Sequence, residues 1–186
     1  MSKPDRNFIS YADSEGLEIL NLTVDPGPEG DETYDDLLKL SHVRSASFRN
    51  LVVLGGRQKE NAIDLNRGCL DVLIDGAVVQ GGRQNAITIK GGCSDITLRD
   101  VTIKRGGGNC DIELGNHSDQ NFNRTRRVRL IRVRMDDGSP VRLRVGHADE
   151  PSIVDCEVER QFRASLGVKF YVAARQLYAR LRGLAP

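Results

Sequence analysis

The strongest constraint on the fold is an internal repeat of 24 residues. The segment Asn61–Cys69 (NAIDLNRGC) matches Asn85–Cys93 (NAITIKGGC), and the match continues without a gap from Asp71–Val79 into Asp95–Ile103. Each copy holds two stretches in which apolar and other residues alternate, and a Gly-rich turn follows. A fixed period of this length is typical of solenoids, in which each repeat forms one coil.

The same alternation extends over most of the chain and predicts stacked strands. Alternation with period two places one set of side chains inside and the other in water. A single coil cannot bury its apolar side, whereas coils stacked about 4.8 Å apart pair each strand with its equivalents. The expected ladders include Asn61 under Asn85 and Cys69 under Cys93. The first stretch of each coil recurs as Ile9/Tyr11, Leu38/Leu40, Ile63/Leu65, Ile87/Ile89, Ile112/Leu114 and Val141/Leu143.

These patterns predict an all-β fold, a right-handed single-stranded parallel β-helix of about six coils over residues 1–160. Right-handedness follows from the usual sense of parallel connections. Residues 161–186 follow a helical period and predict a basic amphipathic α-helix. We expect this helix to cap the open end of the β-helix, or to dock on another subunit or a larger assembly. A doubly wound α/β fold would need helical segments between strands, and none is predicted before residue 160.

The coil pattern over roughly residues 8–160 resembles the pectate-lyase-like superfamily of right-handed β-helices. That superfamily includes polysaccharide lyases, glycoside hydrolases, epimerases and bacteriophage tail-associated proteins, so the resemblance does not select an activity. The segment Asp111–Gln120, with Gly- and Asn-rich coils around it, is also similar to β-helix proteins encoded by phages and prophages.

An enzyme with this fold would carry acids on an outward strand face. The outward positions of the first stretch form a predicted row of Lys39, Asp64, Thr88, Glu113 and Arg142. Asp64 and Glu113 would lie two coils apart, roughly 9–10 Å, near the upper end for the two carboxyls of an inverting glycosidase. The alternative interpretation is that these charges are simply solvated.

Neither a metal nor a cofactor is predicted. Asp71 and Asp95 stack in adjacent coils, but they have no third carboxylate with which to hold calcium, and Asx turns explain them better. His117 lies beside Asp119 in an insertion at Asn116–Arg126 and is a weak ligand candidate. A lone histidine in a loop more often has no catalytic or ligand-binding role.

An arginine-rich surface is the main candidate for ligand binding. Its members would face outward across the last two coils, where a polyanion such as nucleic acid or an acidic glycan could bind. The alternatives are a solvated face, or a face that meets the acids of a neighbouring subunit. The candidate residues are Arg127, Arg129, Arg134, Arg142 and Arg144.

The remaining features bear on location and assembly. The first residues contain no apolar core of a signal peptide, and no apolar run is long enough for a membrane span, so we expect a cytoplasmic or virion location. Cys69, Cys93, Cys110 and Cys156 are expected to be free thiols, although a Cys69–Cys93 bridge is geometrically feasible. An acidic N-terminal end and a basic C-terminal end would favour homo-oligomerisation.

The leading functional hypothesis from sequence is a non-enzymatic structural or binding β-helix protein, associated with phages or virions. A carbohydrate-active enzyme, either a polysaccharide lyase or a glycoside hydrolase, is the alternative from another class. A small protein that binds an anionic ligand is the third.

Overall fold

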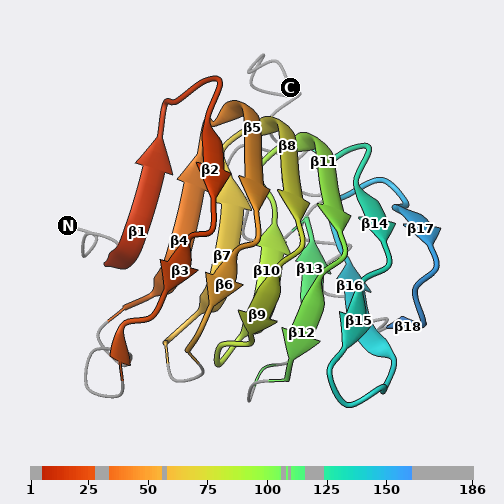
Figure 1. Ribbon diagram of the computed structural model, residues 1–186. Helices are drawn as coiled ribbons and strands as arrows, with labels where there is room; N and C mark the ends of the chain where they lie inside the picture. Colours follow the sequence, from red (N-terminus) through yellow and green to blue (C-terminus); the bar gives the residue numbers. More distant parts are fainter. Residues whose placement is uncertain are drawn as a thin grey trace, which may run out of the picture.

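The computed structural model describes residues 6–27, 34–55, 58–105, 108, 110–115 and 124–160. These residues form an all-β parallel solenoid with about five turns, in which three sheets surround one core (Figure 1). The predicted C-terminal helix at 161–186 lies outside the described residues, as does His117. In Figure 1 the coils stack side by side from β1 on the left to β17 and β18 on the right.

Sheet A contains the first stretch of each repeat. Its strands pair in parallel and in the register that the sequence predicts for Asn61 with Asn85 and for Ile63 with Ile87. Its strands, in order, are β1 (Asn7–Ala12), β4 (Asp36–Ser41), β7 (Asn61–Asn66), β10 (Asn85–Ile89), β13 (Ile112–Leu114), β16 (Val141–Val145) and β18 (Val158–Arg160).

Sheets B and C contain the two halves of the second stretch. Sheet B consists of β2 (Glu18–Leu20), β5 (Arg44–Arg49), β8 (Leu70–Asp75), β11 (Ser94–Arg99), β14 (Arg129–Ile131) and β17 (Ser152–Val154). Sheet C consists of β3 (Thr23–Val24), β6 (Val52–Val53), β9 (Val78–Gln80), β12 (Thr102–Lys104) and β15 (Arg134–Met135).

The predicted count of six coils is too high. The last coil is incomplete, because it has no strand in sheet C. After β17 the chain forms no strand beside β15, because β18 pairs with β16 in sheet A, where Val158 is opposite Val141. At the edge of sheet C the backbone N–H of Val133 donates instead to the Cys156 thiol sulfur, 3.2 Å away. The solenoid therefore has about five turns.

The corners of the coils depend on residues in the left-handed conformation. The turn from sheet B to sheet C has a positive φ at the same position in each coil, because the chain bends there within two residues. Asn and Asp tolerate this conformation better than most residues, which explains their recurrence. The stacked residues are Asn21, Asn50, Gly76, Asp100, Arg132 and Asp155.

The core holds the inward side chains of all three sheets. Phe48 is its largest fully buried side chain, and its ring meets that of Tyr11 edge-on at 5.8 Å. Cys69 and Cys93 are buried in the same core, in successive coils, and both are free thiols. Apolar side chains at equivalent positions thus stack along the solenoid as the repeat predicts.

Candidate functional site

The structure contains the outward row that the sequence predicts for sheet A, except that the last residue of the row differs from the predicted one. Strand pairing aligns Lys39 with Asp64, and Thr88 with both Asp64 and Glu113. The sequence placed Arg142 next in the row, which is wrong. β16 pairs two residues further along than expected, so Arg144 is opposite Glu113.

The interpretation that this row is solvated is also wrong. Lys39 is 9% exposed, Asp64 0%, Thr88 1% and Glu113 5%. On the central strands β4, β7, β10 and β13 every residue is buried, on the outer as well as the inner face. Charged groups that are buried in this way must be paired or hydrogen-bonded.

Asp64 lies between two lysines. The Lys90 Nζ is 3.2 Å from its Oδ1, and the Lys39 Nζ is 3.8 Å from its Oδ2. The Asn66 side-chain amide donates to the same Oδ2 at 2.7 Å. Burial raises the pKa of Asp64, while the two lysines act in the opposite direction.

Asp36 is the second buried acid of this face. Asn61 donates to its Oδ1 from both the backbone N–H at 3.2 Å and the side-chain amide at 2.9 Å. The Lys39 Nζ lies 3.4 Å from its Oδ2. Burial and the nearby charge of Asp64 raise the pKa of Asp36 to about 6, although Lys39 opposes that rise.

The asparagine ladder connects these acids to Glu113. The Asn85 amide lies within donating distance of Asn61 Oδ1 (3.2 Å), Thr88 Oγ1 (3.0 Å) and Glu113 Oε2 (3.1 Å). The Thr88 hydroxyl donates to Asn61 at 2.8 Å, and Arg144 Nη1 donates to Glu113 Oε1 at 3.2 Å. The asparagine ladder therefore joins side chains of the outer face of sheet A to one another.

Together these groups form one polar cluster that crosses five strands, the sheet A network. Each of its carboxylates has a cation or an amide donor of the same chain nearby, but Asp36 Oδ2 and Asp64 Oδ1 are buried with no hydrogen bond and have only a lysine Nζ, at 3.4 and 3.2 Å. The raised pKa values of Asp36 and Asp64 make proton transfer chemically feasible. The members are Asp36, Lys39, Asn61, Asp64, Asn66, Asn85, Thr88, Lys90, Glu113 and Arg144.

Three of the five arginines proposed to bind a polyanion are paired with acids of the preceding coil. Arg127 binds Asp95 through two bonds of 2.6 Å each. Arg142 binds Asp111 through its Nη2 at 2.8 Å, its Nε at 3.2 Å and its backbone N–H at 2.8 Å. Arg144 binds Glu113, as described above.

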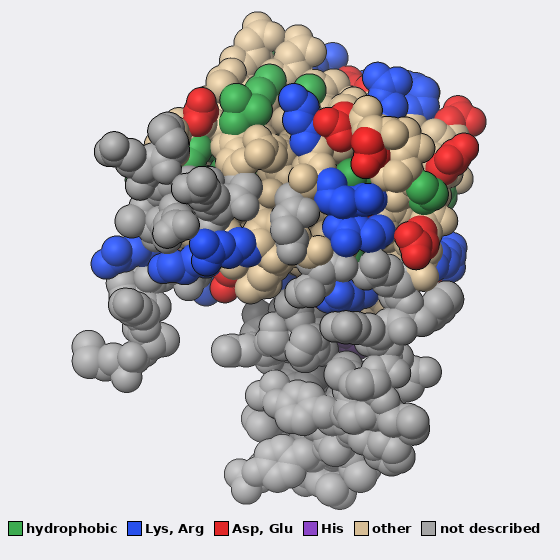
Figure 2. Space-filling view, turned by 90° about the horizontal axis from the view of Figure 1, so that it is seen from below, with side chains coloured by type: hydrophobic (Ala, Val, Ile, Leu, Met, Phe, Trp, Pro, Cys, Tyr) green, Lys and Arg blue, Asp and Glu red, His purple; other side chains and the backbone are tan. Residues whose placement is uncertain are grey.

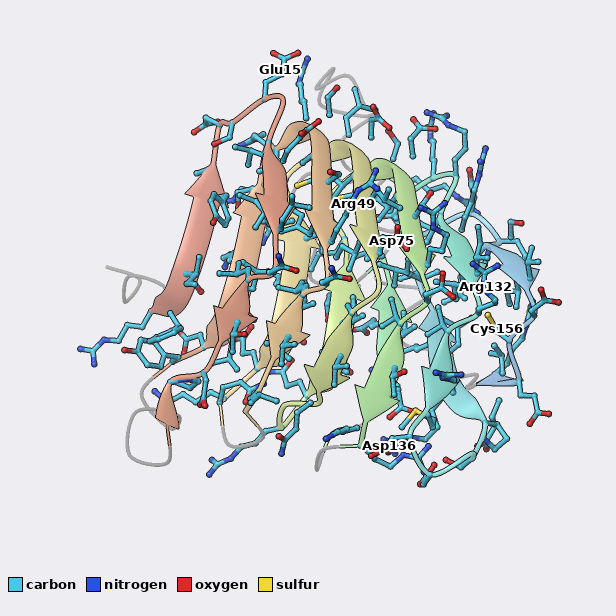
Figure 3. The ribbon with its side chains drawn as sticks, viewed as in Figure 1. Glu15, Arg49, Asp75, Arg132, Asp136 and Cys156 are labelled. Carbon is cyan, nitrogen blue, oxygen red and sulfur yellow. The ribbon has the colours of Figure 1, made fainter. Side chains whose placement is uncertain are left out.

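Two further pairs, each between an acid and an arginine of adjacent coils, were not predicted from the sequence. Arg99 binds Asp75, and Arg132 binds Asp100, each through two bonds. The signal was present, because in each pair the acid and the arginine occupy equivalent positions in adjacent repeats. Asp75 and Arg132 are labelled in Figure 3.

The two other proposed arginines, Arg129 and Arg134, are exposed. Arg134 also lines a shallow hollow of about 200 Å³ with Asp100, Arg132 and Asp155. Acids and bases contribute equally to that lining, so its charge is balanced. On the right of Figure 2, basic and acidic side chains likewise lie next to one another.

The expected polarity of charge along the solenoid is absent from the described coils. The first coil carries Asp13, Glu15, Glu18 and Asp25 against Arg6. The last described coil is also acidic, and the arginine-rich coil is the one before it. Its charged residues are Asp149, Glu150, Asp155, Glu157, Glu159 and Arg160.

Metal binding gains no support. Asp71 and Asp95 occupy equivalent positions, as expected, but Asp95 is held by Arg127. Among the described residues, no group of three or more His, Cys, Asp or Glu side chains could hold a metal ion. In that part of the chain, no helix is long and apolar enough to cross a membrane.

Comparisons with protein-family models, with curated proteins and with solved structures gave no match for this chain.

Proposed function

We propose that this protein is a non-enzymatic β-helix with a structural or binding role. The observation that carries the proposal is the state of the two candidate catalytic carboxylates. Asp64 and Glu113 are buried, and each is neutralised by a cation of the same chain. Groups in this condition stabilise a wall of the solenoid, whereas a glycosidase needs its carboxyls at a surface that the substrate can reach.

Two finer points belong to the same proposal. The solenoid is right-handed, since connections between parallel strands have this sense in about 98% of cases. The protein acts in the cytoplasm or in a virion, as its resemblance to β-helix proteins of phages and prophages suggests. A stiff stack of coils suits a spacer or a docking wall there, because each coil contacts only its neighbours and the length is fixed.

One observation favours a carbohydrate-active enzyme as the second candidate. Asp36 and Asp64 are neighbours with raised pKa values, and perturbed carboxyls of this kind gather at catalytic sites. In such an enzyme one carboxyl would remain protonated and act as the general acid. This role would require the outer face of sheet A to open to the substrate.

A degradation assay separates the two candidates. Full-length protein is incubated with a panel of neutral and acidic polysaccharides, and released reducing ends and unsaturated sugars are measured. Asp64→Asn and Glu113→Gln are assayed beside Asp75→Asn, whose acid also pairs with an arginine but lies on sheet B. We expect no release by any protein. Release that is lost in the first two variants and kept in Asp75→Asn would overturn the proposal.

A further inference from the structure

We propose that Cys69 and Cys93 form a redox site, in which hydrogen peroxide converts the two thiols into a disulfide that joins adjacent coils. Both residues are free cysteines, and neither is a member of the sheet A network. Three observations support the inference: the register of the two residues, the contact between their thiols, and the different surroundings of the other two cysteines.

The register of the coils places the two cysteines at equivalent positions. Cys69 directly precedes β8, and Cys93 directly precedes β11. These strands pair in parallel with Leu70 opposite Ser94, and the Ser94 backbone N–H donates to the Cys69 carbonyl at 2.9 Å. Paired strands lie about 4.8 Å apart, and the Cα atoms of a disulfide are roughly 4.4–6.8 Å apart. The backbone therefore permits a bridge between the two coils.

The two thiols lie on the same side of the backbone and meet inside the solenoid. Both cysteines are 0% exposed and belong to the hydrophobic core. The Cys69 thiol donates to the Asn66 carbonyl at 3.3 Å, which leaves its sulfur to accept the hydrogen bond from Cys93. The two sulfur atoms are thus in contact before any oxidation, so a bridge needs little movement of the chain.

This contact gives the two sulfurs different reactivities. The hydrogen bond from Cys93 lowers the pKa of the Cys69 thiol, whereas the same bond, together with burial, raises the pKa of Cys93. Because the thiolate is the nucleophile, Cys69 is the residue that attacks the peroxide. The peroxide has a short path to it, since Cys69 directly follows a turn in which Arg67 is exposed and Gly68 is half-buried.

The oxidation takes two steps. In the first, the Cys69 thiolate attacks one peroxide oxygen, the O–O bond breaks, and hydroxide leaves and takes up the proton that Cys69 released. Cys69 is then a sulfenic acid. In the second, the Cys93 sulfur attacks the Cys69 sulfur, the S–S bond forms, the S–O bond breaks, and the Cys93 proton leaves with the hydroxyl as water. The two thiols lose two electrons and two protons, and one peroxide is reduced to two waters.

The other two cysteines lack a thiol partner and serve as internal controls. Cys110 is also buried, at 1% exposed, but its thiol donates to Asn85 Oδ1 at 2.9 Å. Burial raises the pKa of Cys110 to about 12, which suppresses the thiolate form. Cys156 is partly exposed, and its thiol donates to the Val154 carbonyl at 3.1 Å. Neither residue should enter an intramolecular disulfide.

Peroxide treatment of the native full-length chain is the test. Trypsin separates the two cysteines, because it cleaves after Arg83 and Lys90 between them. Treatment continues until Cys156 is oxidised, free thiols are alkylated in denaturant, and the chain is digested without a reductant for mass spectrometry of linked peptides. We expect one linkage, between Cys69 and Cys93, which a dithiol reductant reverses. Two alkylated cysteines at these positions, or equal amounts of every linkage, would overturn the proposal.

Alanine variants of the full chain separate the roles of the two sulfurs. Cys93→Ala removes the thiol that completes the disulfide, so peroxide should leave Cys69 as a sulfenic acid, which dimedone traps. Cys69→Ala should carry at least about tenfold less of this adduct, at Cys93, because less thiolate is present there. Cys110→Ala is the matched control and should form the linkage to the same extent as wild type. More adduct at Cys93 than at Cys69 would overturn the assigned roles. The wild-type linkage map requires no variant and decides the proposal where a variant does not fold.

Discussion

Asp64 and Glu113 lie two strands apart in one outer row of sheet A, and Thr88 is paired with both of them. Lys39 and Arg144 complete the row at its two ends, so that each acid has a cation on its far side. The neutral threonine separates the two like charges. This order explains how a wall of the solenoid holds charged groups away from water.

Replacing one acid of the buried row should lower the free energy of unfolding far more than replacing an acid on the surface. Asp64→Asn leaves Lys39 and Lys90 without their shared carboxylate in a buried site, which should lower the free energy of unfolding by about 3 kcal/mol. Asp75→Asn breaks a surface pair with Arg99 and should cost less than about 1 kcal/mol. Urea denaturation measures both, and equal losses would show that the row is not buried in solution.

The pKa of Asp36 predicts an unusual dependence of stability on pH. The folded state holds this proton up to about pH 6, whereas an unfolded aspartate loses it near 4. The contribution of this group to stability is therefore complete below pH 4 and is lost as the pH rises through 6. Wild type should lose stability relative to Asp36→Asn between pH 4.5 and 7.5.

Denaturation of both proteins across this range checks the prediction. The acids that pair with arginines do not obscure it, because Asp95 and Asp111 have lowered pKa values and lose their contribution only below about pH 4. Parallel stability curves for wild type and Asp36→Asn would contradict the assigned protonation.

The repeat predicted much of the fold, since alternation and period determine which residues face the core and which stack. Asn61 under Asn85 and Ile63 under Ile87 were both predicted in this way. Alternation does not show what covers an outward face, so the burial of Asp64 and Glu113 could not be predicted from sequence. Where the period is interrupted before β16, the predicted register was wrong by two residues.

The pairs between acids and arginines illustrate the same limit. The sequence shows Arg127 and Arg142 as outward positive charges, which suggests a surface for polyanions. Their carboxylate partners lie 32 and 31 residues earlier, and only the coil register brings them together. Local charge patterns in a solenoid are therefore a poor guide to surface potential until the strands have been aligned.

Two serines of β5 test the cost of the left-handed backbone conformation, which Ser45 adopts within the strand. Ser45 is exposed and has a φ of 49°, a conformation that costs a residue with a side chain roughly 1 kcal/mol relative to glycine. Ser45→Gly should therefore raise the melting temperature. Ser47, two residues along the same strand, has no positive φ, and glycine there should lower it. The same sign for both substitutions would contradict the left-handed conformation of Ser45.

The central claim, that the charged outer row of sheet A is buried, is tested most directly by lysine modification of the native full-length chain. The Lys39 and Lys90 side chains are 11% and 19% exposed, whereas Lys59 and Lys104 are exposed residues. With an amine-reactive reagent and mass spectrometry, we predict that Lys39 and Lys90 react at least about tenfold more slowly, because burial and ion pairing hold them. Equal rates for all four would show an open face and contradict the account.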